Sequence, residues 1–347
     1  MKQIIDRLRQ NRDLSDGDFL TLLTEIGEAE KAYLFAVART VRQSVYGDDV
    51  YIRGLIEVSN YCKNDCLYCG IRKSNQKVSR YRLDEKTILS CCDVGYSLGF
   101  RTFVLQGGED GWYTDERLVA VIRQIKARYP TVAVTLSLGE RSEDSYRLLF
   151  EAGADRYLLR HETIVPEHYQ KLHPAKMSLK NRIDCLETLK KTGFQVGCGM
   201  MVGSPFQKME YLIEDLRFLQ RFNPQMVGIG PFLPHSDTPF GEQSPGSVEL
   251  TLVLLSIIRL LLPSVLLPAT TALGTAAEDG RERGILAGAN VVMPNLSPAD
   301  VRMKYLLYNN KRSYGSEAAE CLNDLKRRME HLGCHVVVAK GDYKYMP

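Results

Sequence analysis

The sequence lacks an uninterrupted apolar run long enough to cross a membrane. Its most apolar stretch, residues 250–268, is broken by Arg259 and Pro263, so it is too short to span a bilayer. Residues 1–10 predict an amphipathic, charged helix without the apolar centre of a signal peptide. We therefore expect a soluble, cytoplasmic protein that does not act at a membrane.

An excess of charge of one sign is also missing. The 45 basic and 42 acidic residues leave a formal net charge of +3, which is too small to indicate a nucleic-acid-binding surface. No low-complexity tract interrupts the chain, and its composition of 44% hydrophobic and 25% charged residues is typical of globular proteins. A length of 347 residues allows one large domain or two ordinary ones.

The cysteines do not have the pattern of a disulfide framework, because the nine of them are odd in number and irregularly spaced. Cys321 and Cys334 in the C-terminal region are too weakly patterned to indicate a second metal site. Four others fall in apolar, periodic segments, where free cysteines behave as small buried hydrophobic residues. We expect burial for Cys91, Cys92, Cys185 and Cys198.

Three cysteines stand apart from the others in the spacing C-x-x-x-C-x-x-C. Cys62, Cys66 and Cys69 follow a strand-like segment, residues 51–59. Iron–sulfur clusters and structural zinc sites usually take four such ligands, and no second C-x-x-C or H-x-x-x-H follows to complete a zinc site. The simplest interpretation is a [4Fe–4S] cluster ligated at three irons, with the fourth iron left open for chemistry.

Short apolar, β-branched runs alternate with helical patterns from residue 51 onward. Such alternation indicates parallel βαβ units, and eight strand–helix pairs predict a complete (β/α)₈ barrel in an α/β fold. The predicted strands are 51–58, 102–106, 132–137, 156–159, 195–202, 226–230, 266–271 and 290–293. The predicted helices are 84–98, 114–128, 142–152, 178–192, 207–222, 249–262, 280–287 and 297–308.

The barrel pattern leaves a segment at each end of the chain. Residues 1–48 predict an N-terminal helical extension, and residues 49–310 the barrel. Residues 311–347 predict a C-terminal appendage, with a polar helix at 316–332 and a short strand at 336–338. We therefore expect one catalytic domain with two extensions.

Polar, glycine and sulfur-bearing residues recur where the predicted strands end, which is where active sites of such barrels lie. Gly107 and Gly108 would let a backbone approach a ligand closely, although an ordinary turn explains them equally well. Glu109 and Glu162 could accept hydrogen bonds from an ammonium or a ribose, or could be solvated loop carboxylates. His161 could support its neighbours from behind the site.

Several other residues in these positions suit a carboxylate-bearing ligand. Arg156 and Arg160 flank an apolar strand, so at least one of them should point into the barrel or its mouth. Surface ion pairing is the alternative for each arginine. Thr270 and Thr271 add two hydroxyl groups, and Met293 adds a thioether, although these residues also suit a purely structural role.

The cysteine motif resembles that of the radical S-adenosylmethionine (SAM) enzymes. Tyr68 stands just before the third cysteine, and Gly107-Gly108-Glu109 follows the second strand. The resemblance implies that the amino and carboxylate groups of SAM chelate the open iron. It also implies reductive cleavage of SAM to methionine and a 5′-deoxyadenosyl radical, with the protein positioning the cofactor and excluding water.

Within that superfamily, longer strings between residues 51 and 305 resemble the HydE family of [FeFe]-hydrogenase maturases. Among them are residues 104–110, 134–140, 152–163, 226–232, 268–271 and 288–295. The resemblance implies a cluster on Cys62, Cys66 and Cys69, and SAM bound by Tyr68, Gly107, Gly108, Glu109, Ser137, Glu162, Arg182 and Met201. It implies a substrate cavity lined by Gln106, Thr135, Arg156, Arg160, Thr270, Thr271 and Met293.

The same resemblance suggests the reaction and its partners. The substrate would be a cysteine-ligated iron carbonyl cyanide precursor made by HydG, and the product a diiron unit passed to HydF. A ferredoxin or flavodoxin would supply electrons. Some relatives carry three further cysteines near the C-terminus, whereas residues 308–332 contain only Cys321, so we expect a single cluster. Where relatives may have a serine, this chain has Gly107, and one hydroxyl contact is absent.

Three alternatives remain open at this point. A methylornithine synthase-like mutase acting on lysine belongs to the same group, but it needs an acidic anchor for the lysine side chain. A biotin synthase would need extra cysteines and an arginine in the barrel for an auxiliary cluster. A non-catalytic carrier could hold a stored cluster or a zinc ion on the same three cysteines.

Overall fold

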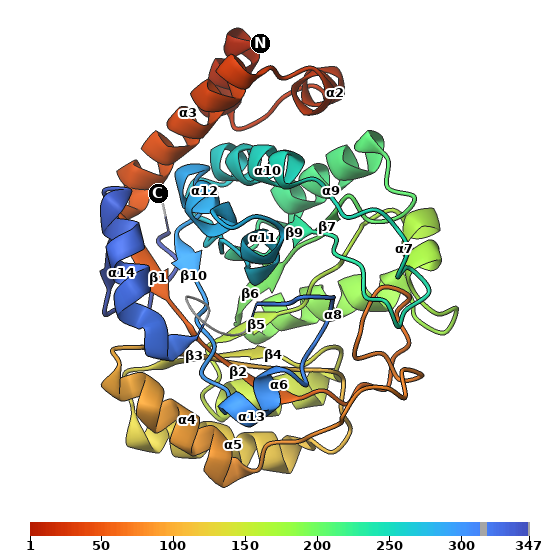
Figure 1. The fold of residues 1–347 in the computed structure, drawn as a ribbon, viewed down its shortest axis with the longest axis vertical. Coiled ribbons are helices and arrows are strands. Elements are labelled where there is room, and N and C mark those ends of the chain that lie inside the picture. The colour runs from red at the N-terminus through yellow and green to blue at the C-terminus, as the bar shows by residue number, and fades with distance from the viewer. Residues whose placement is uncertain (313–317, 346–347) are drawn as a thin grey trace.

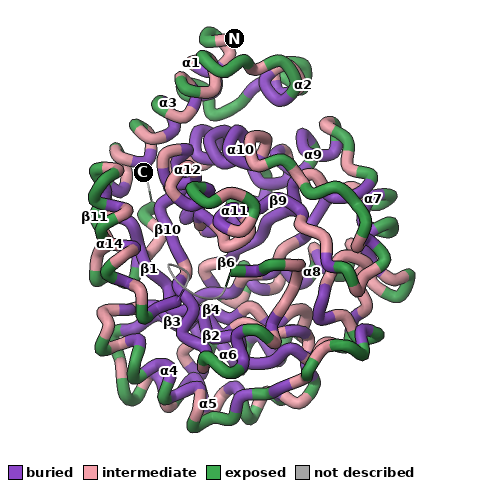
Figure 2. Tube along the Cα trace, in the orientation of Figure 1, coloured by how far each residue is buried: buried purple, intermediate pink, exposed green. Residues whose placement is uncertain are grey.

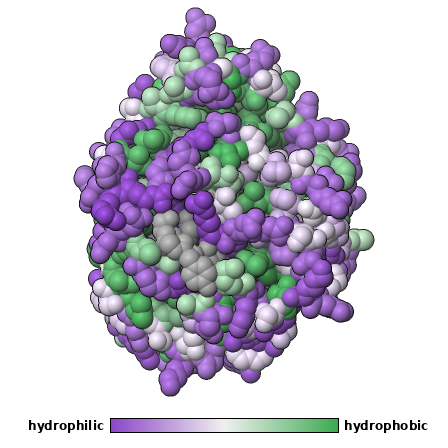
Figure 3. All heavy atoms as spheres, in the orientation of Figure 1, coloured by the Kyte–Doolittle hydropathy of each residue, from purple (hydrophilic) through white to green (hydrophobic). Residues whose placement is uncertain are grey.

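The protein has an α/β fold in which helices surround a set of parallel strands (Figure 1). The computed structural model describes residues 1–312 and 318–345. Polar residues cover much of the face seen in Figure 3, with smaller apolar patches between them. In the described residues, no helix is both long and apolar enough to cross a membrane.

The strands pair in parallel, and those of the largest sheet follow one another in the order of the sequence. The largest sheet has the order β2-β3-β4-β5-β6-β8, and two smaller sheets have the orders β10-β1-β11 and β7-β9. Single parallel bridges join Met226 to Leu266, Pro268 to Val291, and Leu55 to Asn295. The bounds are β1 Asp49–Ile52, β2 Gly54–Ser59, β3 Thr102–Gly107, β4 Ala133–Ser137, β5 Arg156–Leu158, β6 Gln195–Cys198, β7 Met201–Val202, β8 Met226–Val227, β9 Gly230–Pro231, β10 Val291–Val292 and β11 His335–Val337.

The helices that connect the strands lie outside them (Figure 1). Several begin at capping side chains that accept a backbone hydrogen bond, such as Asp84 before α4 and Ser142 before α6. The bounds are α4 Glu85–Ser97, α5 Asp115–Arg128, α6 Glu143–Glu151, α7 Pro166–Leu172, α8 Leu179–Thr192, α9 Met209–Phe222, α10 Val248–Leu261, α11 Thr271–Ala276, α12 Gly280–Leu286 and α13 Ala299–Arg302.

The two ends of the chain pack on the strand-and-helix core. Helices α1 (Lys2–Asn11), α2 (Asp16–Thr24) and α3 (Glu28–Tyr46) lie at the top of Figure 1, and α3 contacts α10. A 3₁₀ turn at Ala319–Cys321 leads into α14 (Leu322–His331), and β11 then pairs in parallel with β1. The predicted start of this helix at residue 316 lies outside the described residues.

Three segments differ from the sequence-based prediction. Helix α7 was not predicted, and residues 271–276 form α11 although residue 271 was predicted to end a strand. The predicted helix 297–308 is reduced to α13, because the chain beyond it turns back over the strand ends. Tertiary contacts hold that turn: Asn60 Nδ2 donates to the Lys304 carbonyl at 2.6 Å, and the Lys311 ammonium donates to the Tyr305 carbonyl at 3.0 Å.

The strands form the buried interior of the molecule (Figure 2). All six residues of β2 are buried, as are the first four of β3. The burial predicted for the four cysteines in apolar segments is confirmed, with relative exposures of 0–7% for Cys91, Cys92, Cys185 and Cys198.

Candidate active site

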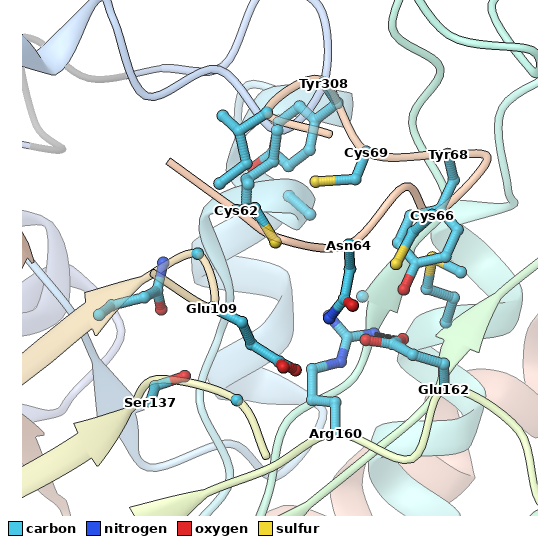
Figure 4. Close-up of a pocket in the computed structure, with 18 of the residues that line it drawn as sticks. Cys62, Asn64, Cys66, Tyr68, Cys69, Glu109, Ser137, Arg160, Glu162 and Tyr308 are labelled. Carbon is cyan, nitrogen blue, oxygen red and sulfur yellow. Dashed lines mark ion pairs between the residues drawn. The ribbon is translucent and has the colours of Figure 1, made fainter. Parts of the chain in front are cut away.

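A cavity of about 300 Å³ lies where the parallel strands end (Figure 4). The cysteine loop after β2, the glycine pair at the end of β3 and the segment after β5 all contribute to its wall. Residues from β9 and from the turn after α13 complete the lining. Because these segments come from many parts of the chain, the fold itself assembles the cavity.

The three motif cysteines line this cavity together. Figure 4 shows Cys62, Cys66 and Cys69 along one loop above Glu109 and Arg160. All three are free thiols. Burial, followed by the charge of the neighbouring Cys62, raises the pKa of Cys69 to about 12. Burial and the other two cysteines likewise raise the pKa of Cys66. The thiols are therefore close enough for the charge of one to raise the pKa of another.

The arrangement of the cysteines fits a cluster better than a single ion. Among the described residues, no three His, Cys, Asp or Glu side chains converge on one metal ion. A [4Fe–4S] cluster needs no such convergence, because each cysteine ligates a different iron. Three free thiols around one cavity are thus a suitable donor set for three irons of a cluster.

Arg80 holds the cysteine loop in shape. Its guanidinium donates to the carbonyl of Ile71 at 2.8 Å and to that of Arg72 at 2.7 Å. Asp65 accepts from Arg72 Nε at 2.6 Å, and this contact lowers the pKa of the Asp65 carboxyl. The loop is therefore braced by its own side chains as well as by the fold.

Gly108 is required by contact between two loops of the protein. A Cβ at Gly108 would lie 2.2 Å from the Tyr61 carbonyl oxygen and 2.7 Å from the Cys62 Cβ. The backbone of the cysteine loop thus packs directly against that of Gly108. The glycine pair was predicted to allow a close approach to a ligand, and in the structure Gly108 allows a close approach between these two segments. This contact fixes Cys62 relative to the end of β3.

Arg182 connects three strand-end segments beneath the cysteine loop. Its Nε donates to Glu140 Oε1 at 2.5 Å and its Nη1 donates to the Arg160 carbonyl at 2.6 Å. Its Nη2 lies 3.9 Å from Glu109 Oε1. Burial alone would lower the pKa of Arg182, but nearby Tyr169 and the two carboxylates outweigh it and raise that pKa. The guanidinium therefore stays charged and holds Glu109 at the cavity wall.

Glu162 has a left-handed backbone conformation, with φ of 66°, which is strained for a residue with a Cβ. Its N–H donates to the Gly199 carbonyl at 3.0 Å. Behind it, His161 Nδ1 accepts from the Gly199 N–H at 3.2 Å, and His161 Nε2 lies 3.2 Å from Asp215 Oδ1. His161 Nδ1 therefore accepts a backbone hydrogen bond, whereas Nε2 lies near Asp215 without hydrogen-bond geometry. Buried contacts thus support the strained turn.

Three polar atoms at the cavity wall are buried without a hydrogen-bond partner: Arg160 Nε, Glu162 Oε2 and Thr270 Oγ1. Glu162 Oε2 does lie 3.0 Å from Arg160 Nη2 as an ion pair, though without hydrogen-bond geometry. Buried polar groups normally have partners. A donor and acceptors left free beside the cysteines suit a ligand that carries both charges, as the ammonium and carboxylate of SAM do.

The structure brings most of the predicted site residues together and leaves some apart. The cavity is lined by Cys62, Cys66, Cys69, Tyr68, Gln106, Gly107, Gly108, Glu109, Ser137, Arg160, Glu162, Arg182, Met201 and Thr270. Four predicted substrate residues lie outside this lining, namely Thr135, Arg156, Thr271 and Met293. Arg156 differs most from its prediction. It is the first residue of β5, whereas the cavity lies where the strands end, and its guanidinium binds Asp342 of the tail.

The cavity also contains residues that the sequence did not single out. Tyr305 and Tyr308 from the turn after α13 line it, as do Asn64 and Met177. Figure 4 shows Tyr308 and Asn64 beside the cysteines. The two tyrosines were missed because residues 297–308 were predicted to be a helix on the outside of the barrel. Asn64 could have been predicted only from its position between Cys62 and Cys66 in the cysteine motif.

The cavity and its three cysteines define the class of protein. The sequence profile of the Radical SAM superfamily matches residues 56–219. Structures with the same fold include methylornithine synthase (PylB), with a TM-score of 0.84, 28% identity and coverage of 96% of this chain and 97% of that chain. Another is HydG, a maturase of the [FeFe]-hydrogenase, with a TM-score of 0.79, 21% identity and coverage of 96% and 74%.

Comparison with curated proteins identifies the family within this superfamily. The [FeFe] hydrogenase maturase subunit HydE of Thermotoga maritima is 44% identical over 300 residues, covering 86% of this chain and 85% of that protein. The 3-methylornithine synthase of Methanosarcina acetivorans is 30% identical over 333 residues, covering 94% and 92%. The chain belongs to the HydE family of radical SAM enzymes. Its cofactors are those of the superfamily, a [4Fe–4S] cluster and SAM.

Proposed function

We propose that this protein is a radical SAM enzyme that acts in assembly of the diiron site of [FeFe]-hydrogenase. The observation that carries the proposal is the cavity that three free cysteines line together with Arg160 Nε and Glu162 Oε2, two buried atoms without a hydrogen-bond partner. The 44% identity to a HydE protein supports the reaction class. The cluster with bound SAM supplies reductive cleavage of SAM to methionine and a 5′-deoxyadenosyl radical.

Each part of the cavity wall has a role in this proposal. Cys62, Cys66 and Cys69 hold the cluster. Glu162 and Glu109 accept hydrogen bonds from SAM, and Arg182 fixes the position of Glu109. The remaining proposed SAM contacts are Tyr68, Gly107, Gly108, Ser137 and Met201, all of which line the same cavity.

The substrate is a small molecule that bears a carboxylate and lies deeper among the strand ends. Gln106, Arg160 and Thr270 line the cavity, and the guanidinium and hydroxyl groups suit a carboxylate. The further proposed substrate residues are Thr135, Thr271 and Met293, whereas the predicted role of Arg156 is not kept, because its guanidinium is bound to Asp342 of the tail. For Thr135, a buried hydroxyl without a hydrogen-bond partner supports this role. A cysteine-ligated iron carbonyl cyanide precursor has the required size and charge.

We propose further that the parallel strands form a complete (β/α)₈ barrel over residues 49–310, with extensions at residues 1–48 and 311–347. Continuous pairing from β2 to β8 supports this, together with the bridges Met226–Leu266, Pro268–Val291 and Leu55–Asn295. Cytoplasmic location fits the low-potential chemistry. The proposal also includes three partners. HydG supplies the precursor, HydF accepts the product, and a ferredoxin or flavodoxin supplies the electrons.

Anaerobic reconstitution tests the enzyme class. The reconstituted and reduced protein should give a [4Fe–4S] EPR signal that SAM changes, and it should form 5′-deoxyadenosine. Cys62→Ala should abolish both results, while Cys321→Ala should leave the iron content at about four atoms per chain, as expected for one cluster. A carrier that merely stores a cluster would show no effect of SAM and no 5′-deoxyadenosine.

In vitro hydrogenase maturation tests the biological role. A mixture that lacks only this component should gain hydrogenase activity when the purified protein is added, and the Cys62→Ala variant should not restore it. The methylornithine synthase relatives define the competing result. Conversion of lysine without hydrogenase activation would show that the proposed role is wrong even though the enzyme class is right.

A further inference from the structure

A second cavity lies against the outer side of the cluster site. It has a volume of about 810 Å³ and is bounded by α7, the segment after it, and the start of α8. Met177 forms part of the wall of both cavities. Its Sδ lies 3.8 Å from the Sγ of Cys66. One methionine side chain thus lies between a proposed cluster ligand and an opening at the surface.

The cysteine loop and the segment around Met177 pack directly on each other. The Leu67 N–H donates to the Leu172 carbonyl at 3.0 Å, and the Lys176 ammonium lies 3.4 Å from the Lys63 carbonyl. In Figure 1 the orange cysteine loop accordingly lies beside α7. The two segments therefore form one surface over the cluster site.

This surface is basic, although the protein as a whole is nearly neutral. Residues 61–80 and 171–180 together hold eight basic residues and one acidic residue, while the entire chain has a net charge of only +3. The acidic residue, Asp65, is paired with Arg72. The basic residues are Lys63, Arg72, Lys73, Lys77, Arg80, Lys171, Lys176 and Lys180.

Carboxylates from neighbouring elements neutralise only part of this charge. Lys63 pairs with Glu109 at 3.1 Å, Lys77 with Asp237 at 2.6 Å, and Lys180 with Asp184 at 2.6 Å. By contrast, the exposed Lys73, Lys171 and Lys176 enter none of the ion pairs found among residues 1–312 and 318–345. The charges of these three ammonium groups are therefore not neutralised by a carboxylate of the described residues.

The centre of the surface is partly apolar. The second cavity is lined by Ile164, Pro166, Tyr169, Ala175, Met177, Leu179 and Ile183, and also by the polar or charged residues Gln170, Ser178, Lys180 and Asp184. Nearby, Phe206 is 56% exposed, and the Lys171 ammonium lies 5.4 Å from the centre of its ring. An apolar centre with charged groups around it is the usual composition of a protein–protein interface.

We propose that this basic surface is where an acidic one-electron carrier protein docks to reduce the cluster. It consists of the second cavity, Lys180 in its lining, and a rim that we define as Lys171 and Lys176, which are next in sequence to lining residues. The inference rests on the proposed function. The carrier loses one electron to the cluster, and that electron passes to the sulfonium of SAM, where the C5′–S bond breaks to give methionine and the 5′-deoxyadenosyl radical. Opposite charges steer the encounter, and Met177 Sδ lies 3.8 Å from the Sγ of Cys66, a proposed cluster ligand.

Charge reversal at the rim tests the inference. The double variant Lys171→Glu/Lys176→Glu removes two of the unpaired charges without touching the cavity that holds SAM. The matched control is Lys86→Glu/Lys191→Glu, which reverses two exposed lysines on α4 and α8 away from this surface. The probes are a reduced bacterial ferredoxin and a reduced flavodoxin, and photoreduced deazaflavin serves as a small, uncharged reductant.

The first readout is binding. The Kd of the ferredoxin for the reconstituted protein, measured by calorimetry, should rise at least about tenfold in the rim variant at low salt and stay unchanged in the control. The salt dependence of binding should also be weaker in the rim variant. Equal affinity in the rim variant and the unchanged protein, or an equal loss in the control, would overturn the inference.

The second readout is 5′-deoxyadenosine formation with each reductant. The rate driven by ferredoxin or flavodoxin should fall roughly tenfold in the rim variant, while the rate driven by deazaflavin should match that of the unchanged protein. An equal loss of rate with all three reductants would show that the lysines act in folding or in SAM binding, and it would refute the docking proposal. Absence of product with deazaflavin in the unchanged protein would instead refute the proposed function.

Discussion

Arg156 Nη2 lies 2.6 Å from Asp342 Oδ1, which joins the first residue of β5 to the C-terminal tail. The same guanidinium nitrogen donates to the carbonyls of Lys340 at 3.2 Å and Gly341 at 3.3 Å. The Arg156 side chain is fully buried, whereas that of Asp342 is 43% exposed. The tail therefore supplies the negative charge for an arginine that has no contact with solvent.

Loss of this carboxylate should destabilise the protein. In Asp342→Asn the buried guanidinium keeps its neutral carbonyl partners but loses its counter-charge, which should cost about 1–3 kcal/mol of the free energy of unfolding. Urea denaturation at neutral pH measures the loss. Lys340→Ala is the matched control, because its exposed ion pair with the same Asp342 should contribute less than about 0.5 kcal/mol. An equal effect of both substitutions would contradict the role of Arg156.

The same pair predicts a pH dependence. Burial acts to raise the pKa of Asp342, but Lys340 and Arg156 outweigh it and hold that pKa below its usual value of 3.8. A carboxyl with a lowered folded-state pKa stabilises the protein above its unfolded pKa and loses this effect as the pH falls through the folded value. The stability difference between the unchanged protein and Asp342→Asn should thus be constant from pH 7 to about 5 and shrink below about pH 4. A difference that grows on acidification would contradict the pairing.

A buried ion pair should hold the turn that covers the cavity. Lys311 donates to the carboxylate of Glu57, and both side chains are almost fully buried, at 5% and 0% exposure. Lys311→Met leaves Glu57 with Asn295 as its remaining partner and should cost about 3–5 kcal/mol. Faster hydrogen exchange of residues 303–311 should accompany the loss.

Two controls test this pair. Lys304→Met, on the same turn, should change the stability by less than about 0.5 kcal/mol. The double variant Glu57→Gln/Lys311→Met should be more stable than Lys311→Met, since it leaves no unpaired buried charge. A double variant less stable than the single one would refute the interpretation.

The sequence predicted the parts of this protein that depend on local pattern. Hydrophobic periodicity located the strands from β2 to β6, and the cysteine spacing indicated the loop that lines the cavity. The turn that carries Tyr305 and Tyr308 was missed, because tertiary hydrogen bonds end α13 at Arg302 despite a helical pattern. The ion-pair partner of Arg156 could not be predicted either, because Asp342 lies 186 residues away in the chain.

His161 and Asp215 should position Glu162 for SAM binding. Asp215 Oδ1 accepts from the Ile164 N–H at 2.6 Å and lies 3.2 Å from His161 Nε2, with both side chains fully buried. Asp215→Ala leaves the buried Ile164 N–H unpaired and removes the carboxylate beside His161 Nε2, which should cost about 1–3 kcal/mol and raise the Kd of SAM roughly tenfold. Asp215→Asn keeps an acceptor oxygen and should restore most of the affinity. An alanine variant that folds and binds SAM normally would show that the pair acts on stability alone.

The backbone of Glu162 should show a conflict between stability and function. Its φ of 66° is costly for glutamate and free of cost for glycine. Glu162→Gly should therefore raise the free energy of unfolding by about 0.5–1 kcal/mol. The same substitution removes a carboxylate proposed to bind SAM, so the Kd of SAM should rise at least about tenfold, which is worth about 1.4 kcal/mol.

Glu162→Gln separates the two effects, because it keeps the Cβ, and with it the backbone strain, but removes the charge. It should bind SAM as weakly as the glycine variant to within a few fold, without the gain in stability. Calorimetric SAM binding to the reconstituted protein and urea denaturation of each variant provide the two measurements. If Glu162→Gly were less stable than the unchanged protein, the lost ion pair with Arg160 would outweigh the relief of strain. If both variants bound SAM normally, Glu162 would not be part of its binding site.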